Sequence, residues 1–180
     1  GRADLVTSNN AYMARRTGEL GAVPAKVHVV TLGAERYDLE LSEQSVNRLA
    51  PDPAHAPCII STRAHEPLYH VADIIDAHAR VAQDRPDARL VVAHGGSLTA
   101  ELRRRAESSG ARVEFAGFLA RAEFREALSQ AHVFVSVPAS DATSVALLQA
   151  MGAGAFPIVS DLPSQREWIR DGFNGFLVPD

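Results

Sequence analysis

Six short apolar runs, rich in β-branched residues, alternate with segments of helical period along most of this chain. Runs that are apolar almost throughout are typical of strands in a sheet that is covered on both faces. Repeated strand–helix–strand units connect through right-handed crossovers and build a parallel sheet with helices on both sides. The sequence therefore predicts a doubly wound α/β domain. Its predicted strands are residues 58–62, 90–93, 113–116, 133–137, 156–160 and 176–178.

The segments between these strands place apolar residues three and four positions apart, as helices with one buried face do. Gly152 and Gly154 are expected to end the fourth helix, and Asp171-Gly172 closes a short fifth helix predicted from Ser164 to Arg170. The stripes of the first four helices lie within residues 71–82, 98–106, 124–131 and 145–151.

The first 50 residues form a separate pattern. A strand near Leu5, a helix that begins after Asn9 or Asn10 and a strand from Val27 to Thr31 make one βαβ unit, which is too small to fold alone. Three prolines within residues 51–57 indicate a stiff linker. We therefore expect residues 1–50 to be the remnant of a preceding N-terminal domain of a longer protein. Residues 58–180 are then the ligand-binding domain.

Composition excludes several classes of protein. A chain of 180 residues with 46% hydrophobic residues can bury a core without disulfides or metals. The net charge of −4 argues against a general nucleic-acid binder, and no apolar run approaches the roughly 20 residues of a membrane span. The single cysteine, Cys58, rules out an internal disulfide and favours a cytoplasmic location.

The ligand crevice of such a sheet lies at the carboxyl ends of the strands, where the strand order reverses. With the common order 3-2-1-4-5-6, the loop carrying Arg63 would face the loop of residues 138–144, which opens a helix. A guanidinium and free helix N–H groups suit phosphate, and the Asp141 carboxylate suits hydroxyl groups. This combination indicates a phosphorylated, hydroxyl-rich ligand such as a sugar nucleotide.

Each of these features also has a simpler interpretation. Asp141, Thr143 and Ser144 are good helix caps whatever the function, and Arg63 could pair with Glu66 at the surface. Gly95-Gly96 is most often just a turn.

Other kinds of site lack their signatures. The sequence contains no Gly-Lys-Ser/Thr phosphate loop and no Gly-x-Gly-x-x-Gly after a strand, which disfavours a nicotinamide cofactor. Its histidines show no metal-binding spacing. Cys58 lies inside a strand without an evident histidine partner, which argues against a thiol nucleophile.

Nearly the whole chain resembles the retaining glycosyltransferases of family 4. The most specific stretch runs from Asp141 through Gln149, Ala150 and Met151 to a small-residue turn and a strand, where the family usually has Glu, seven residues, Glu and Ala-Met. Pro163 with Glu167, residues 171–178 and residues 24–33 are similar to family features as well. The resemblance implies the Rossmann-like donor-binding half of a GT-B fold.

The resemblance also implies how a nucleotide diphosphate sugar would bind. Asp141 would hold donor-sugar hydroxyls, Gln149 the ribose hydroxyls and Arg63 the diphosphate. The backbone of Thr143, Ser144 and Val145 would meet the diphosphate and sugar, and Leu119 would touch the base. No metal is expected, because Arg63 and helix N–H groups would offset the charge of the leaving diphosphate. No catalytic residue or cofactor is assigned.

Two positions depart from the family pattern. Gln149 replaces an acidic residue, and residues 68–70 lack the phosphate-binding lysine that often follows the arginine. The alternatives are therefore a non-catalytic nucleotide-binding module of the same fold and a nucleotide-sugar epimerase. The acceptor stays unknown, peripheral membrane association of the longer protein stays open, and we expect this chain alone to be inactive.

Overall fold

All six predicted strands pair in one parallel sheet, as the sequence indicates. The computed structural model describes residues 3–33 and 56–179. The sheet has the order β5-β4-β3-β6-β7-β8, which is the assumed order 3-2-1-4-5-6. Its strands are β3 (Cys58–Ser61), β4 (Arg89–Ala93), β5 (Val113–Gly117), β6 (Val133–Ser136), β7 (Phe156–Ser160) and β8 (Phe176–Val178).

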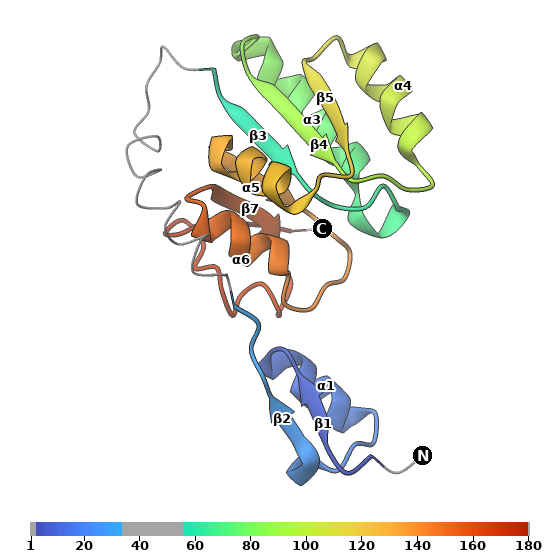
Figure 1. The fold of residues 1–180 in the computed structure, drawn as a ribbon, viewed down its shortest axis with the longest axis vertical. Coiled ribbons are helices and arrows are strands. Elements are labelled where there is room, and N and C mark those ends of the chain that lie inside the picture. The colour runs from blue at the N-terminus through green and yellow to red at the C-terminus, as the bar shows by residue number, and fades with distance from the viewer. Residues whose placement is uncertain (1–2, 34–55, 180) are drawn as a thin grey trace.

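Helices cover both faces of this sheet (Figure 1). On one face, α3 (Val71–Asp84) and α4 (Thr99–Ser109) share a buried cluster with the sheet. On the other face, α5 (Arg121–Gln130) and α6 (Val145–Gly152) share a second cluster. The predicted doubly wound α/β class is thereby confirmed. The strand order reverses between the two inner strands β3 and β6, where the covering helices change from one face of the sheet to the other.

Alternating side chains along the strands supply both clusters. In β4, Leu90 and Val92 belong to the cluster under α3 and α4, whereas Val91 between them belongs to the cluster under α5 and α6. Successive residues of a strand point to opposite faces, so a strand covered on both sides must be apolar at every position. This requirement is why the strands read as continuous apolar runs in the sequence.

The predicted short helix from Ser164 to Arg170 is wrong. Residues 163–168 form turns, with backbone hydrogen bonds that converge on the carbonyl groups of Leu162 and Gln165. The Ser164 and Gln165 side chains bind a neighbouring loop instead of following one helical face. Tertiary contacts therefore override the local helical pattern.

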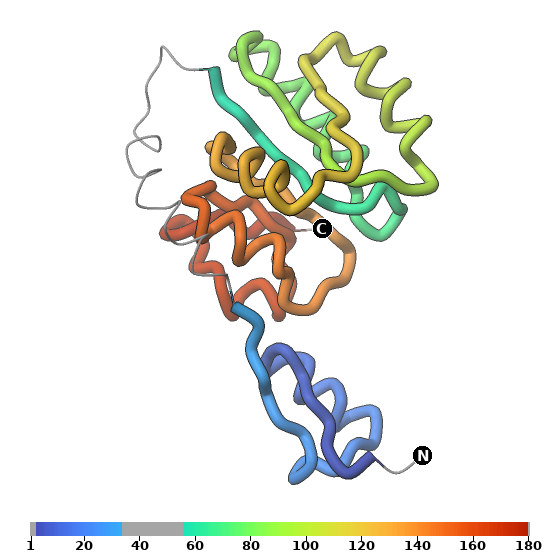
Figure 2. The backbone as a smooth tube through the Cα atoms, viewed as in Figure 1, coloured from blue at the N-terminus to red at the C-terminus, as the bar shows by residue number. Residues whose placement is uncertain are grey.

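The leading segment is a βαβ unit at one end of the molecule (Figures 1 and 2). Strand β1 (Val6–Ser8) pairs in parallel with β2 (Val27–Val29), and α1 (Ala11–Glu19) connects them through a single 3-10 turn, Pro24–Lys26. Asn10 is the cap of α1, which confirms one of the two predicted cap residues. Most of the expected linker 51–57 lies outside the described residues, so the proposed domain boundary stays a prediction.

None of the helices in the described ranges combines the length and apolar character that a bilayer span requires.

Phe134 tests the importance of the central core, because it lies in β6 beside β3 and is fully buried. Phe134→Ala should lower the free energy of unfolding by about 3–5 kcal/mol, since it leaves a cavity between tightly packed layers. Urea unfolding measures this change. Phe173→Ala is the matched control, because that ring is 74% exposed, and its loss should cost less than about 1 kcal/mol. Equal losses would contradict the assignment of the core.

Candidate functional site

Arg63 and Asp141 meet where the strand order reverses. Arg63 lies two residues beyond β3, and Asp141 lies in the loop between β6 and α6. Arg63 Nη2 donates a hydrogen bond to Asp141 Oδ2, and only 13% and 18% of the two side chains are exposed. The two groups that the sequence analysis places across the crevice are therefore a directly paired cation and anion.

Two further contacts orient the Arg63 guanidinium. Its Nε donates to Ser136 Oγ at 2.6 Å, and its Cζ lies 5.3 Å from the centre of the Tyr69 ring. Ser136 is the last residue of β6, and Tyr69 lies in the single 3-10 turn Pro67–Tyr69 that precedes α3. A guanidinium held by a carboxylate, a hydroxyl and an aromatic face keeps a defined direction. Neither Ser136 nor Tyr69 was predicted from the sequence to support Arg63.

Asp141 is held from a second segment far along the chain. Ser164 Oγ donates to the Asp141 backbone oxygen at 2.7 Å, and Gln165 Nε2 lies 3.5 Å from Asp141 Oδ2. Both supporting side chains are buried. The turn of residues 163–168 thus fixes the Asp141 loop. This support for Asp141 could not be predicted from the residue pattern, because the contact depends on how two distant loops pack.

The cap of α6 is Ser144, whose Oγ accepts from the Leu147 N–H at 3.2 Å. Asp141 does not cap this helix, although its Oδ1 accepts from the Ala142 N–H at 2.9 Å. In the part of the chain that the structure describes, no protein atom accepts from the Val145 or Ala146 N–H. These donors, with the positive end of the helix dipole, favour an anion at this point.

The remaining predicted residues occupy different positions. Thr143 is buried, and its hydroxyl group is engaged with the leading unit, whereas Val145 is partly exposed at the start of α6. Gln149 is half-buried one turn further along this helix. Leu119 is half-buried just beyond β5, an edge strand separated from β3 by β4. The structure therefore gathers Arg63 and residues 141–145, and leaves Leu119 on a separate loop at the same end of the strands.

The loops after β3 and β4 are tied together beside this site. The His65 N–H donates to the Gly95 carbonyl at 3.1 Å, and the His65 carbonyl accepts from the Leu98 N–H at 2.9 Å. A Cβ at Gly96 would lie 2.6 Å from the His65 carbonyl oxygen. Gly96 is therefore required by a close backbone approach and is more than a simple turn residue.

The alternative pairing of Arg63 with Glu66 is wrong. The Glu66 carboxylate accepts from the Ser97 N–H at 2.7 Å and from Ser97 Oγ at 2.6 Å. These two bonds lower the pKa of Glu66, so its carboxylate stays charged and bound to the neighbouring loop. The carboxylate that pairs with Arg63 is therefore that of Asp141.

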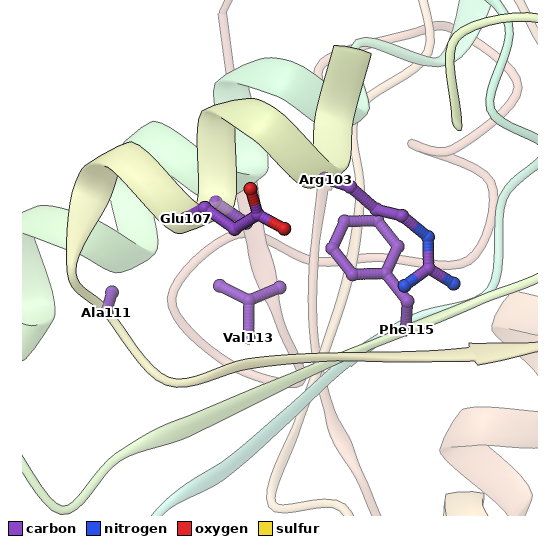
Figure 3. A pocket seen from close by; sticks show the side chains of 6 residues that line it. Arg103, Glu107, Ala111, Val113 and Phe115 are labelled. Carbon is purple, nitrogen blue, oxygen red and sulfur yellow. The ribbon is translucent and has the colours of Figure 1, made fainter. Parts of the chain in front are cut away.

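No candidate metal cluster among the described residues coincides with the Arg63–Asp141 pair. The described residues contain no group of three or more histidine, cysteine, aspartate or glutamate side chains placed to hold a metal ion. A pocket shown in Figure 3 lies between α4 and the edge strand β5, where the Arg103 guanidinium lies 4.7 Å from the Phe115 ring centre. It belongs to the outer edge of the sheet, away from the β3–β6 junction.

Several known proteins are similar to this chain. The family model for glycosyl transferases group 1 matches residues 51–180. Over 118 residues the chain is 34% identical to the phosphatidyl-myo-inositol mannosyltransferase of Mycobacterium tuberculosis, a match that covers 65% of this chain and 31% of that protein. The chain thus spans about a third of the length of the curated relatives it matches.

Solved structures show the same fold. The pneumococcal O-GlcNAc transferase GtfA, in complex with UDP and GlcNAc, superposes with a TM-score of 0.79 at 18% identity, covering 99% of this chain and 34% of that one. Anabaena HepE, in complex with UDP and glucose, gives 0.77 at 19% identity, covering 98% and 50%. These likenesses confirm the expected Rossmann-like architecture of a GT-B fold.

The buried histidines predict how stability depends on pH. Burial lowers the pKa of His65, because its charged form would lose water, and burial lowers the pKa of His78 in the same way. The unfolded chain binds protons at these positions first, near pH 6.5, so the free energy of unfolding should fall as the pH drops below about 6.5.

Urea unfolding between about pH 7.5 and about pH 5.5 measures the slope of the free energy of unfolding against pH. His65→Gln and His78→Gln should each make it shallower, and the double variant shallower still. Slopes identical to that of the unsubstituted chain in both single variants would contradict this account.

Proposed function

The chain belongs to the glycosyl transferases group 1 family, and on this premise we propose that residues 58–180 bind the nucleotide diphosphate sugar of a retaining glycosyltransferase. The observation that carries the proposal is the Arg63–Asp141 pair beside the first turn of α6. One cation, one carboxylate and two free N–H groups lie together at the carboxyl ends of the central strands, where ligands of this fold class bind.

The diphosphate binds to the positively charged part of this site. The Arg63 guanidinium presents a planar fork of donors, and the Val145 and Ala146 N–H groups add donors from the helix N-terminus. As the sugar leaves, negative charge grows on the diphosphate oxygens. Fixed donors that already point at those oxygens stabilise this charge without a metal ion.

The sugar binds to the Asp141 carboxylate through its hydroxyl groups. Asp141 Oδ2 is bound to Arg63, and a phosphate oxygen is a competing partner for the guanidinium. When the diphosphate engages Arg63, the carboxylate gains capacity to accept from sugar hydroxyl groups. Ser164 and Gln165 hold the Asp141 loop while this exchange of partners takes place.

The remaining groups of the donor extend from this centre. Gln149 accepts from the ribose hydroxyl groups through its amide oxygen, and Leu119 touches the base. Support comes from GtfA and HepE, whose structures contain UDP and a sugar. Because the chain spans about a third of the length of its curated relatives, we infer that the acceptor site and the remaining catalytic groups are supplied from outside these 180 residues. On this proposal, the chain alone binds the donor without turnover.

A non-catalytic nucleotide-binding module of the same fold is the second candidate. It is favoured by Gln149, which accepts from a ribose hydroxyl more weakly than a carboxylate would, and by the absence of a lysine within residues 68–70. Titration calorimetry of the chain with UDP, GDP and ADP, each with its sugar conjugate, separates the candidates. A module that binds nucleotide but does not distinguish the sugar conjugate would contradict the donor-binding proposal.

Asp141→Ala should weaken binding of the sugar nucleotide by about 1.5–3 kcal/mol, the range for hydrogen bonds to charged groups. It should leave UDP binding unchanged or tighter, because it removes a carboxylate that competes with the phosphates for Arg63. Arg63→Ala should weaken UDP binding more than UMP binding. Calorimetry with the four ligand–variant pairs measures both effects.

Asp87→Ala is the matched control. It removes another arginine-bound carboxylate, which lies 3.0 Å from Arg85 just before the amino end of β4, and it should alter neither affinity. Equal losses of UDP and sugar-nucleotide binding in Asp141→Ala would contradict the role given to this carboxylate.

A further inference from the structure

Asn10 is the one buried residue in the described part of the leading unit, residues 3–33. Its side chain has 0% exposure, although α1, which it caps, contains no buried residue. A unit of this size cannot hide an asparagine on its own. The burial comes from contact between the start of α1 and the loop that carries Asp141.

The Asn10 amide and the Thr143 hydroxyl group both have hydrogen-bond partners at this contact. Asn10 Oδ1 accepts from the Met13 N–H at 2.7 Å, while Nδ2 donates to Thr143 Oγ1 at 3.1 Å. The Thr143 hydroxyl group donates in turn to the Asn9 carbonyl oxygen at 3.2 Å. A buried amide is costly unless it is paired, so this arrangement favours one specific orientation of the leading unit.

Glu167 makes a second contact with the same end of the helix. Its carboxylate oxygens accept from the Ala11 N–H at 3.1 Å and the Tyr12 N–H at 2.7 Å. The first amides of a helix have no partner within the helix, and a negative charge there is favoured by the helix dipole. A carboxylate 155 residues away in the chain thus completes the N-terminus of α1.

Both contacts come from the two segments that support Asp141. Thr143 follows Asp141 by two residues, and Glu167 lies in the turn whose Ser164 and Gln165 bind the Asp141 loop. We propose that Thr143 and Glu167 form the docking site for the leading βαβ unit, and that docking holds the loop of residues 141–144 in place. This inference does not depend on which ligand the loop binds.

Amide hydrogen exchange of the 180-residue chain, followed by NMR without ligand, tests the proposal. In Glu167→Ala, the Ala11 and Tyr12 amides should exchange roughly five- to tenfold faster, the effect of losing a helix cap. The amide signals of residues 141–144 should shift as the unit undocks. Glu167 is exposed, so the signals of the six-stranded sheet should keep their positions.

Glu123→Ala is the matched control. It removes a carboxylate that binds the Ala120 N–H at 2.8 Å at the start of α5, and it should leave Ala11 and Tyr12 unchanged. Unchanged exchange of Ala11 and Tyr12 in Glu167→Ala would overturn the docking site. Faster exchange with unmoved signals of residues 141–144 would overturn the claim that docking holds the loop.

Thr143→Val probes the buried half of the contact without altering the shape of the side chain. It leaves Asn10 Nδ2 and the Asn9 carbonyl without their partner, so the Asn10 side-chain amide protons should exchange faster than in the unsubstituted chain. Equal rates in the two chains would show that the hydroxyl group does not hold the leading unit. Because no nucleotide is present, a chain that failed to bind any sugar nucleotide could still pass this test.

Discussion

The ion pair between Arg63 and Asp141 is the interaction on which the rest of the site depends. It joins the loops that follow the two inner strands of a parallel sheet, where the chain changes faces and the loops diverge. A charged pair at such a junction, largely withdrawn from water, is stabilising only when its remaining hydrogen-bonding groups are satisfied. Ser136 accepts from the guanidinium, and the Ala142 N–H and Gln165 bind the carboxylate. Ser164 binds the Asp141 backbone carbonyl and so holds the loop that carries this charge.

The pair also explains how one site can serve two parts of one ligand. Within the pair, the two charges neutralise each other. A diphosphate competes for the guanidinium, which turns the carboxylate into an acceptor for hydroxyl groups nearby. In our proposal, this exchange of partners replaces a metal ion as the means of balancing charge, and the free N–H groups of α6 complete it.

Much of the architecture could be predicted from residue pattern alone. Strands covered on both faces are apolar throughout, so the six runs were visible, and the strand order then brought Arg63 and Asp141 together. Contacts between distant segments were not visible. The turn at residues 163–168 looks helical locally, and only its packing against the Asp141 loop shows why it is not. Glu66 lies near Arg63 in sequence, yet it binds the loop after β4.

The contact between the leading unit and the site also joins distant segments, so it could not be predicted from the sequence either. Asn10 is a typical helix cap by sequence, and nothing local shows that its amide group also reaches Thr143. Glu167 belongs to a segment that resembles a family feature, but its bonds to the first amides of α1 arise only in the folded chain. Long-range polar contacts of this kind have no periodicity, which is why pattern analysis does not detect them.

A crystal structure of the chain soaked with a nucleotide diphosphate sugar tests the central claim most directly. Our account predicts the diphosphate against the Arg63 guanidinium and the first turn of α6, with a sugar hydroxyl group within hydrogen-bonding distance of the Asp141 carboxylate. A donor bound elsewhere, with the Arg63–Asp141 pair intact and untouched, would contradict it.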